Sequence, residues 1–417
     1  MKKIIIAHAG KQHSFELAEA LIKNKYKVQY ITTVYDRKKS LTHFFKNILG
    51  KNNKKRANQR YSEIMNDDVI QFYEILGLVS LILLRIDKKR LLYPKFNRFL
   101  YKKFSKKVAK FALHYKPDVL IMYDGQASTC FEILSKNNSK IIKVLDMSSL
   151  SLPYMKNIYE KDMKINPSYK RDLLKFSDYI FNDKNQKDAV KEINLADSIF
   201  VPSEICRKSI LYVNKKSKIF IIPYGFKNNP TDSTYKFKHN STTLNFIYTG
   251  SVNQRKGISY LFESVNQIKR KFPERDFRLT IIGKYDKNNE IISHYFDDFT
   301  FRGFLLKEKV IEELKEADLM IFPSLSDSFS FSVLEALSIG VPVICSDNTG
   351  ASDIIEDGKN GFVFRTQNIE DLVRKIELAI SSEKHLKEMG RQAKKSVEIY
   401  TWDNYSNKIG EVLKEIV

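Results

Sequence analysis

Cysteine is scarce in this sequence of 417 residues, and long apolar runs are absent. The three cysteines, Cys130, Cys206 and Cys345, stand far apart and form no CxxC pair, which excludes a disulfide framework and a cysteine zinc site. The longest apolar stretch, residues 75–84, is about half as long as a membrane-spanning helix, and the apolar run after Met1 is too short for a signal peptide. We therefore expect a cytoplasmic protein.

Acidic residues are few relative to basic ones, and the imbalance is concentrated in one stretch. The formal net charge is +22, and residues 37–110 alone contain 20 Lys or Arg against 5 Asp or Glu. Such a stretch attracts polyanions, so one interpretation is a peripheral contact with an anionic membrane surface. A lysine-rich solvated face is the other interpretation. We do not expect nucleic acid as a partner, because no zinc finger, RNA-binding aromatic motif or Arg-rich tail accompanies the charge.

Short apolar runs alternate with segments of helical period along the whole chain. The expected strands are residues 4–7, 28–32, 119–123, 141–145, 198–201 and 219–222, followed by 244–248, 278–282, 319–322, 341–345 and 361–364. This alternation predicts an α/β protein with two Rossmann-like parallel-sheet domains facing a cleft. We place an N-terminal domain at 1–225, a turn-rich linker at 226–243 and a C-terminal domain at 244–400.

Within the N-terminal domain, two segments differ from the simple alternation. Residues 93–115 carry apolar side chains at helical spacing with lysines on the other face, which predicts one long amphipathic helix. Residues 37–92 show no regular period, and we expect an insertion of short helices there.

A serine-rich loop follows the expected strand at 319–322 and leads into a helix that begins near Phe331 or Ser332. Backbone amides at a helix N-terminus, together with small hydroxyl side chains, make an anion site. Asp327 lies in this loop and Glu335 lies in the helix. Two carboxylates beside a phosphate would repel it unless they face hydroxyl groups, and the vicinal hydroxyls of a ribose or hexose suit them.

Residues 326–344, SDSFSFSVLEALSIGVPVI, resemble the Glu-x7-Glu signature and the Ala-x-x-x-Gly-x-Pro-Val-Ile run of retaining glycosyltransferases of family 4, which have the GT-B fold. The resemblance implies that Glu335 holds the ribose hydroxyls of a nucleotide and that Asp327 is the catalytic carboxylate facing the donor sugar. It also implies that the backbone amides of Ser330, Phe331 and Ser332 bind the diphosphate.

The loop departs from the family pattern at three positions. Asp327 stands where the family has Glu, so its side chain is one methylene shorter and its contact with the sugar is altered or bridged by water. Ser328 and Ser330 stand where loop glycines are usual, which leaves the backbone less freedom.

Residues 248–264, YTGSVNQRKGISYLFES, resemble the family's Gly-Arg…Glu-Lys-Gly phosphate element through Gly250 and Lys256. Ser251 occupies the usual Arg position, and Arg255 occupies the usual Glu position. We expect Arg255 to replace the missing guanidinium. A pair of cations would then balance the negative charge that grows on the departing nucleotide.

Weaker matches extend the resemblance through the rest of the C-terminal half. Gly283 ends a strand that lies near the nucleotide in the family. Residues 302–324 resemble the segment that flanks the base, and residues 357–364 resemble a structural turn. Residues 400–417 resemble a closing helix, and we expect residues 401–417 to pack back on the N-terminal domain.

The N-terminal half offers cleft candidates and no strong motif. Gly10 and His13 follow the first strand and resemble the family's glycine loop and first helix, although His13 is also interpretable as a packing histidine. Asp146 ends the strand expected at 141–145, and Asp124 follows another strand. The two carboxylates are equal candidates for binding the acceptor or the sugar.

The resemblance implies transfer of a hexose from a UDP- or GDP-sugar to an acceptor hydroxyl with retention at the anomeric carbon. The acceptor would be a glycan or a lipid-linked glycan of surface polysaccharide or glycolipid synthesis. No Asp-x-Asp occurs, and Arg255 with Lys256 can balance the diphosphate, so we expect no metal and no further cofactor. Epimerase or phosphorylase chemistry on the same fold and a non-catalytic sugar-nucleotide-binding protein are the alternatives. A nicotinamide oxidoreductase is disfavoured because no GxGxxG follows the first strand.

Overall fold

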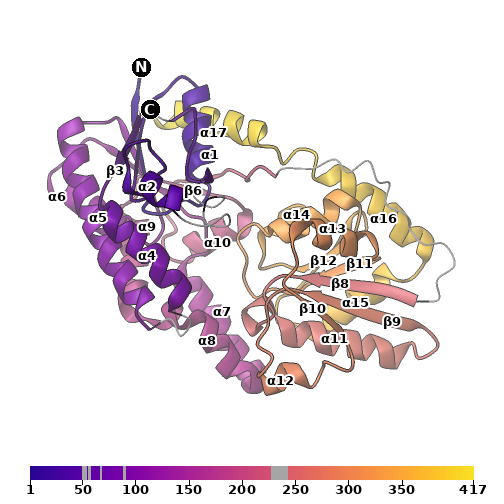
Figure 1. Cartoon of the computed structure of the whole chain (residues 1–417). Helices are drawn as coiled ribbons and strands as arrows, with labels where there is room; N and C mark the ends of the chain where they lie inside the picture. The colour runs from indigo at the N-terminus through magenta and orange to yellow at the C-terminus, as the bar shows by residue number, and fades with distance from the viewer. Residues whose placement is uncertain (49–53, 55–57, 66–67, 88–90, 227–242) are drawn as a thin grey trace.

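The structure, a computed structural model, describes residues 1–48, 54, 58–65, 68–87, 91–226 and 243–417, and it divides into two α/β domains (Figure 1). Almost all of the linker expected at 226–243, and parts of the insertion expected at 37–92, lie outside the described residues. No helix within the described ranges combines the length and the apolarity that crossing a bilayer requires.

The N-terminal domain is built on a parallel sheet of seven strands in the order β3-β2-β1-β4-β5-β6-β7. The strands are β1 (Lys3–Ala7), β2 (Lys27–Thr32), β3 (Val69–Gln71), β4 (Val119–Tyr123), β5 (Ile142–Asp146), β6 (Ser198–Val201) and β7 (Ile219–Ile221). In β4 every residue is buried, as expected of a parallel strand that helices cover on both faces. The edge strand β3 was not predicted, because three residues are too short for a detectable period.

Helices cover both faces of this sheet. They are α1 (Ser14–Lys23), α2 (Leu41–Ile48), α4 (Glu74–Ile86), α5 (Tyr93–Tyr115), α6 (Ser128–Lys136), α7 (Leu152–Ile165), α8 (Lys170–Phe181), α9 (Asp183–Leu195) and α10 (Glu204–Leu211). Helix α5 has the predicted bounds, and it buries an apolar stripe that includes Leu100, Phe104 and Val108. Helices α7, α8 and α9 between β5 and β6 were not predicted.

The C-terminal domain contains a parallel sheet of six strands in the order β10-β9-β8-β11-β12-β13. The strands are β8 (Thr243–Thr249), β9 (Asp276–Ile282), β10 (Thr300–Gly303), β11 (Leu319–Phe322), β12 (Val343–Ser346) and β13 (Gly361–Phe364). The helices are α11 (Ile258–Lys271), α12 (Glu290–Ser293), α13 (Lys307–Lys315), α14 (Phe331–Ile339), α15 (Ile369–Ala379), α16 (Glu383–Ser396) and α17 (Trp402–Ile416). Two parallel sheets of this kind confirm the predicted fold class.

The chain ends on the domain in which it began. Helix α17 leaves the C-terminal domain and lies beside α1 (Figure 1). The side-chain amide of Asn24 donates to the backbone oxygen of Ser406 at 2.9 Å, and Gly410 packs directly against Asn24. The carboxyl ends of the two sheets also meet, because the hydroxyl of Ser203, after β6, donates to the backbone oxygen of Ser328, after β11, at 2.7 Å.

Candidate active site

Three loops at the carboxyl edge of the second sheet pack so closely that two of them need glycine. A Cβ atom at Gly283, after β9, would lie 1.7 Å from the backbone oxygen of Gly250, after β8. At Gly257, where φ is +70°, a Cβ atom would lie 1.8 Å from the backbone oxygen of Pro323. These approaches bring the predicted positions Gly250 and Gly283 together, with the exposed Ser251 beside them.

Lys256 and Asp327 form an ion pair between the loop after β8 and the loop after β11. Lys256 ends a short 3-10 helix, Gln254–Lys256, and its ammonium also lies 5.3 Å from the ring centre of Phe322. Asp327 accepts a further hydrogen bond from the backbone N–H of Phe329 at 3.2 Å. Burial alone would raise the pKa of Asp327, but the ammonium of Lys256, the hydroxyl of Ser330 and the N–H of Phe329 together hold that pKa below its usual value. Asp327 is therefore ionised at neutral pH.

The N-terminus of α14 leaves donors available for an anion. The amide groups of Ser330, Phe331 and Ser332 donate to no acceptor within the part of the chain that the structure describes. The hydroxyl of Ser330 is enclosed and lies close enough to the carboxylate of Asp327 to help lower its pKa. Because Asp327 bonds to Phe329, these donors lie beside the Lys256–Asp327 pair. The arrangement has the character of a phosphate site at a helix N-terminus.

Ser330 has a left-handed backbone, with φ 62° and ψ 64°, whereas Ser328 has no positive φ. A non-glycine residue in this region costs about 1 kcal/mol, while an unneeded glycine costs a similar amount in chain entropy. We therefore expect Ser330→Gly to raise the free energy of unfolding by about 0.5–1 kcal/mol and Ser328→Gly to lower it by a similar amount. Urea denaturation measures both, and shifts of the same sign would contradict this explanation.

Glu335 lies on α14 and is mostly buried, with 26% of its side chain exposed. The nearest cation is Lys307, whose ammonium lies 3.9 Å from the carboxylate. Burial raises the pKa of Glu335, and Lys307 offsets only part of that effect. Among the described residues nothing donates a hydrogen bond to this carboxylate, so its acceptor positions stay open for ligand hydroxyls.

Arg255 lies against the N-terminal domain. Its guanidinium contacts the hydroxyl of Tyr159 on α7, and it is near enough to Tyr179 on α8 and to Asp327 to interact with both electrostatically. Its Nε–H is enclosed and has no hydrogen-bond acceptor among the described residues. An enclosed donor of this kind is costly unless a ligand oxygen satisfies it, so the role predicted for Arg255 stays a prediction.

In the N-terminal domain, the structure joins two of the four predicted candidates. The Nε2 atom of His13 lies 2.9 Å from a carboxylate oxygen of Asp146, and both side chains are almost completely buried. The ring of His13 also packs against Tyr224, with 4.3 Å between ring centres. Tyr224 in turn stacks on Phe331 at 6.2 Å, so one aromatic ring separates the His13–Asp146 pair from the start of α14.

The other two candidates, Asp124 and Gly10, form hydrogen bonds with residues of nearby loops. The carboxylate of Asp124 accepts hydrogen bonds from the hydroxyls of Ser148 and Ser149 at 3.1 and 2.5 Å. Burial raises the pKa of Asp124, and these serines partly offset it. The N–H of Gly10 donates to Nδ1 of His8 at 2.8 Å. Asp124 and Asp146 are thus not equivalent, because only Asp146 belongs to the pair that faces α14.

Glu192 on α9 holds the turn that follows Asp124. Its carboxylate accepts the N–H groups of Gly125, Ala127 and Ser128 at 2.7–3.0 Å. Burial raises the pKa of Glu192 to about 8, despite these three donors. No local pattern in the sequence distinguishes this glutamate from the other charged residues of α9.

The raised pKa of Glu192 predicts a pH dependence of stability. The unfolded chain releases this proton near the usual value of about 4.3, whereas the folded chain releases it near 8. Stability that is present below the unfolded pKa is therefore lost as the pH rises toward about 8. We expect the free energy of unfolding to fall more steeply between pH 5 and 8 in the wild type than in Glu192→Gln. Urea denaturation at several pH values measures this, and parallel profiles would contradict it.

Helices α7 and α8 of the N-terminal domain contact the loop that carries Lys256. This contact was not predicted from the sequence. The buried carboxylate of Asp162 accepts hydrogen bonds from the side chains of Gln254 and Tyr260, both at 2.8 Å. Asp172 accepts the backbone N–H of Gln254 at 2.6 Å. Burial raises the pKa of both aspartates. The N-terminal domain thus positions part of the predicted donor site.

The loop that carries Asp327 is held in the same way. The hydroxyls of Tyr159 on α7 and of Ser326 lie 2.6 Å apart. The Ser203 contact described above fixes the backbone oxygen of Ser328. Residues of the N-terminal domain thus contact both loops of the predicted donor site.

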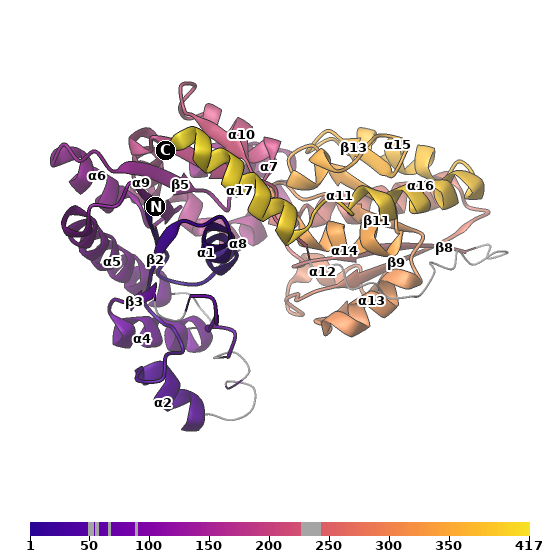
Figure 2. The same cartoon turned by 90° about the horizontal axis from the view of Figure 1, so that it is seen from above.

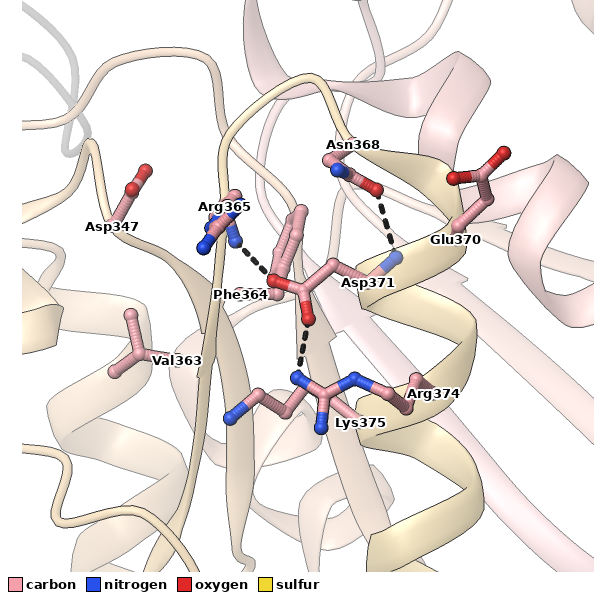
Figure 3. A pocket seen from close by; sticks show the side chains of 9 residues that line it. All are labelled: Asp347, Val363, Phe364, Arg365, Asn368, Glu370, Asp371, Arg374 and Lys375. Carbon is pink, nitrogen blue, oxygen red and sulfur yellow. Dashed lines mark hydrogen bonds and ion pairs between the residues drawn. The ribbon is translucent and has the colours of Figure 1, made fainter.

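A separate pocket of about 510 Å³ lies on the C-terminal domain beside α15 (Figure 3). Its centre is occupied by Asp371, which accepts the backbone N–H of Arg365 at 2.8 Å and a guanidinium N–H of Arg374 at 2.6 Å. The carboxylate at its centre is thus neutralised by Arg374, and none of the predicted site residues lines the pocket.

Part of the chain matches a known protein family, and the whole chain matches known structures. Residues 231–396 match the family model described as glycosyl transferases group 1. The chain is 23% identical over 182 residues to D-inositol 3-phosphate glycosyltransferase of Paenarthrobacter aurescens, covering 42% of this chain and 45% of that protein. It is 24% identical to the capsular polysaccharide biosynthesis glycosyltransferase CapM of Staphylococcus aureus, covering 53% and 63%. The chain spans about half the length of the curated relatives it matches.

Solved structures with two domains of the same kind superpose over the whole chain. Sucrose-phosphate synthase from Thermosynechococcus elongatus gives a TM-score of 0.65 at 15% identity, covering 100% of this chain and 99% of the other. An Anabaena HepE structure in complex with UDP gives 0.59 at 15% identity, covering 100% of both chains. Identities this low establish the fold alone.

Proposed function

We propose that this chain, whose residues 231–396 match the glycosyl transferases group 1 family, transfers a hexose from a nucleotide-sugar to an acceptor hydroxyl with retention of configuration. The observation that carries the proposal is the uncapped N-terminus of α14 beside the Lys256–Asp327 pair and Glu335. It combines a phosphate site with two carboxylates, which is the chemistry that a sugar diphosphate requires.

In this proposal the donor lies along the carboxyl edge of the second sheet. Glu335, with open acceptor positions, binds the ribose hydroxyls. The amides of Ser330, Phe331 and Ser332 bind the diphosphate, together with Lys256 and the enclosed Nε–H of Arg255. Gly250, Ser251 and Gly283 line the close approach beside it. UDP is the favoured nucleotide, because a HepE structure of the same fold is described with UDP-glucose bound.

Binding a diphosphate would release Asp327 from Lys256. The ammonium of Lys256 neutralises one carboxylate now, and a diphosphate brings more negative charge to the same place. Lys256 then stabilises the charge that grows on the leaving nucleotide, and Asp327 turns toward the sugar. No residue is required as a nucleophile, since the leaving phosphate can accept the proton of the attacking hydroxyl. The reaction needs no metal in this scheme.

The acceptor side is the N-terminal domain. The His13–Asp146 pair faces the start of α14 across Tyr224, where an acceptor hydroxyl or the donor hexose would bind. The match to a capsular polysaccharide glycosyltransferase favours a glycan or lipid-linked acceptor. The basic residues of 37–110 would bring the enzyme to an anionic membrane surface, where such acceptors lie.

A thermal-shift screen with UDP-, GDP-, ADP- and CMP-sugars tests the donor first. At a donor concentration of about 100 times Kd, binding adds about 2.7 kcal/mol to the free energy of unfolding. Nucleoside diphosphate should then be released only when an acceptor is present, and NMR of the product should show a retained anomeric configuration. Release without acceptor, an inverted product, or activity that a chelator abolishes and a divalent ion restores would each overturn a part of the proposal.

A further inference from the structure

Helix α4 presents an apolar stripe on its outer face. Ile75, Ile82 and Ile86 are 64%, 54% and 67% exposed, and Val79 between them is partly exposed. These positions recur every three or four residues, so their side chains lie along one line of the helix. An outer helix face normally carries charges, whereas this stripe consists of β-branched aliphatic residues alone.

Further apolar side chains are exposed just before and on α5. Leu91, Leu92 and Phe99 are 64%, 63% and 49% exposed. The two helices are joined through a hydrogen bond of 3.0 Å between the side chains of Ser80 and Asn97. Exposed apolar side chains gathered on two neighbouring helices indicate a site that binds a partner.

The surroundings of this surface are strongly basic. Helix α5 contains no acidic residue, and the exposed lysines along it are Lys95, Lys102, Lys103, Lys106, Lys107 and Lys110. The ammonium of Lys103 lies 4.8 Å above the ring of Phe99, so the charge borders the apolar surface directly. A partner must therefore be apolar and anionic at once, as an anionic bilayer is. A second copy of this chain fits poorly, because its own lysines would face these.

We propose that the stripe of α4 inserts into the headgroup region of an anionic bilayer while the lysines of α5 contact lipid phosphates. Figure 2 shows α2 and α4 projecting from the N-terminal domain, away from the C-terminal domain. The inference extends the membrane contact of the proposed function from charge alone to insertion of a named helix face. The biological role of this insertion rests on the proposed function. Binding to vesicles can be tested separately, because it needs neither donor nor acceptor.

An environment-sensitive fluorophore at position 82 tests insertion. Cys130, Cys206 and Cys345 are buried, so Ile82→Cys offers one reactive thiol for labelling with NBD. Vesicles of phosphatidylcholine with 30% phosphatidylglycerol should shift the emission to the blue and increase its intensity several-fold. The matched control is Ile399→Cys on the C-terminal domain, where Ile399 is 65% exposed and no shift is expected. Sedimentation with vesicles but no shift at position 82 would overturn insertion.

Unlabelled variants separate the apolar contribution from the charge. Lys102→Gln/Lys103→Gln/Lys106→Gln should raise the lipid concentration for half-binding about 100-fold, at about fivefold per lysine. Ile82→Asn/Ile86→Asn should raise it about tenfold or more and should leave a residual binding that 0.5 M salt removes. The control Lys394→Gln/Lys395→Gln should change it less than threefold. A concentration-dependent dimer that Ile82→Asn abolishes would overturn the proposal in favour of a second copy. Transfer to a soluble acceptor, measured in parallel, should stay unchanged in all these variants.

Discussion

Lys256→Ala is expected to lower kcat/KM about 1000-fold, because one charged group at a developing negative charge contributes about 3–4 kcal/mol to transition-state stabilisation. Most of the loss should appear in kcat, since the charge on the nucleotide grows only as the glycosidic bond breaks. The structure adds a second effect. Removal of the ammonium leaves Asp327 partly buried without its cation, which should cost about 2 kcal/mol of stability.

A double variant separates these two effects. Lys256→Ala/Asp327→Asn removes the unpaired carboxylate, so we expect its free energy of unfolding to return to within about 1 kcal/mol of the wild type. Its activity should remain as low as that of Lys256→Ala. Urea denaturation and initial-rate measurements on the same preparations check both statements. Recovery of activity together with stability would mean that Lys256 acts only through the fold.

Acidification offers a further check on the Lys256–Asp327 pair. The pKa of Asp327 is held below its usual value in the folded chain, so the pair contributes stability above the unfolded pKa. That contribution is lost as the pH falls through the folded pKa. The wild type should therefore lose more stability than the double variant below about pH 4.

Glu335→Ala is expected to raise the donor KM about 100-fold with a much smaller change in kcat. Two charge-assisted hydrogen bonds to ribose hydroxyls contribute about 3 kcal/mol in the ground state and the transition state alike, so their loss weakens binding uniformly. Glu335→Gln should give an intermediate effect of about tenfold, since the amide still accepts a hydrogen bond but carries no charge. Initial rates over a range of donor concentrations measure both variants.

The control for Glu335 is its only ion-pair neighbour among the described residues. Lys307→Met removes the cation that lies 3.9 Å away and keeps the length of the side chain. We expect its KM to stay within about threefold of the wild type, because an ion pair at 3.9 Å whose lysine is half-exposed is weak. A KM increase in Lys307→Met as large as that in Glu335→Ala would show that the pair, and not the carboxylate, binds the donor.

Much of the fold could be predicted because its signals are local. Strands β4, β6, β11 and β13 have the predicted bounds, since buried parallel strands are continuous apolar runs. Helix α5 also has its predicted bounds, because its apolar residues and its lysines lie on different faces at the helical period. The short edge strands β3 and β10 and the polar helices α7, α8 and α9 have no such contrast between faces, and they were missed.

Part of the candidate site could also be predicted from one short segment of the sequence. The helix that begins at Phe331, the serine loop before it and the spacing from Asp327 to Glu335 all lie within one short segment. A helix start leaves free amide groups wherever it occurs, so the residue types in that segment were enough to predict an anion site.

The sequence by itself thus determined the two parallel sheets, the long basic helix and the start of α14, because periodicity and helix ends depend on neighbouring residues. Only the tertiary structure paired His13 with Asp146, 133 residues away. It also showed that Asp124 accepts hydrogen bonds from two serines instead. Only the tertiary structure placed Asp162 against Gln254, so that the N-terminal domain holds the loop of Lys256. The physical reason is that a buried carboxylate is stable only where distant elements bring it hydrogen-bond donors, and no short segment records which elements will meet.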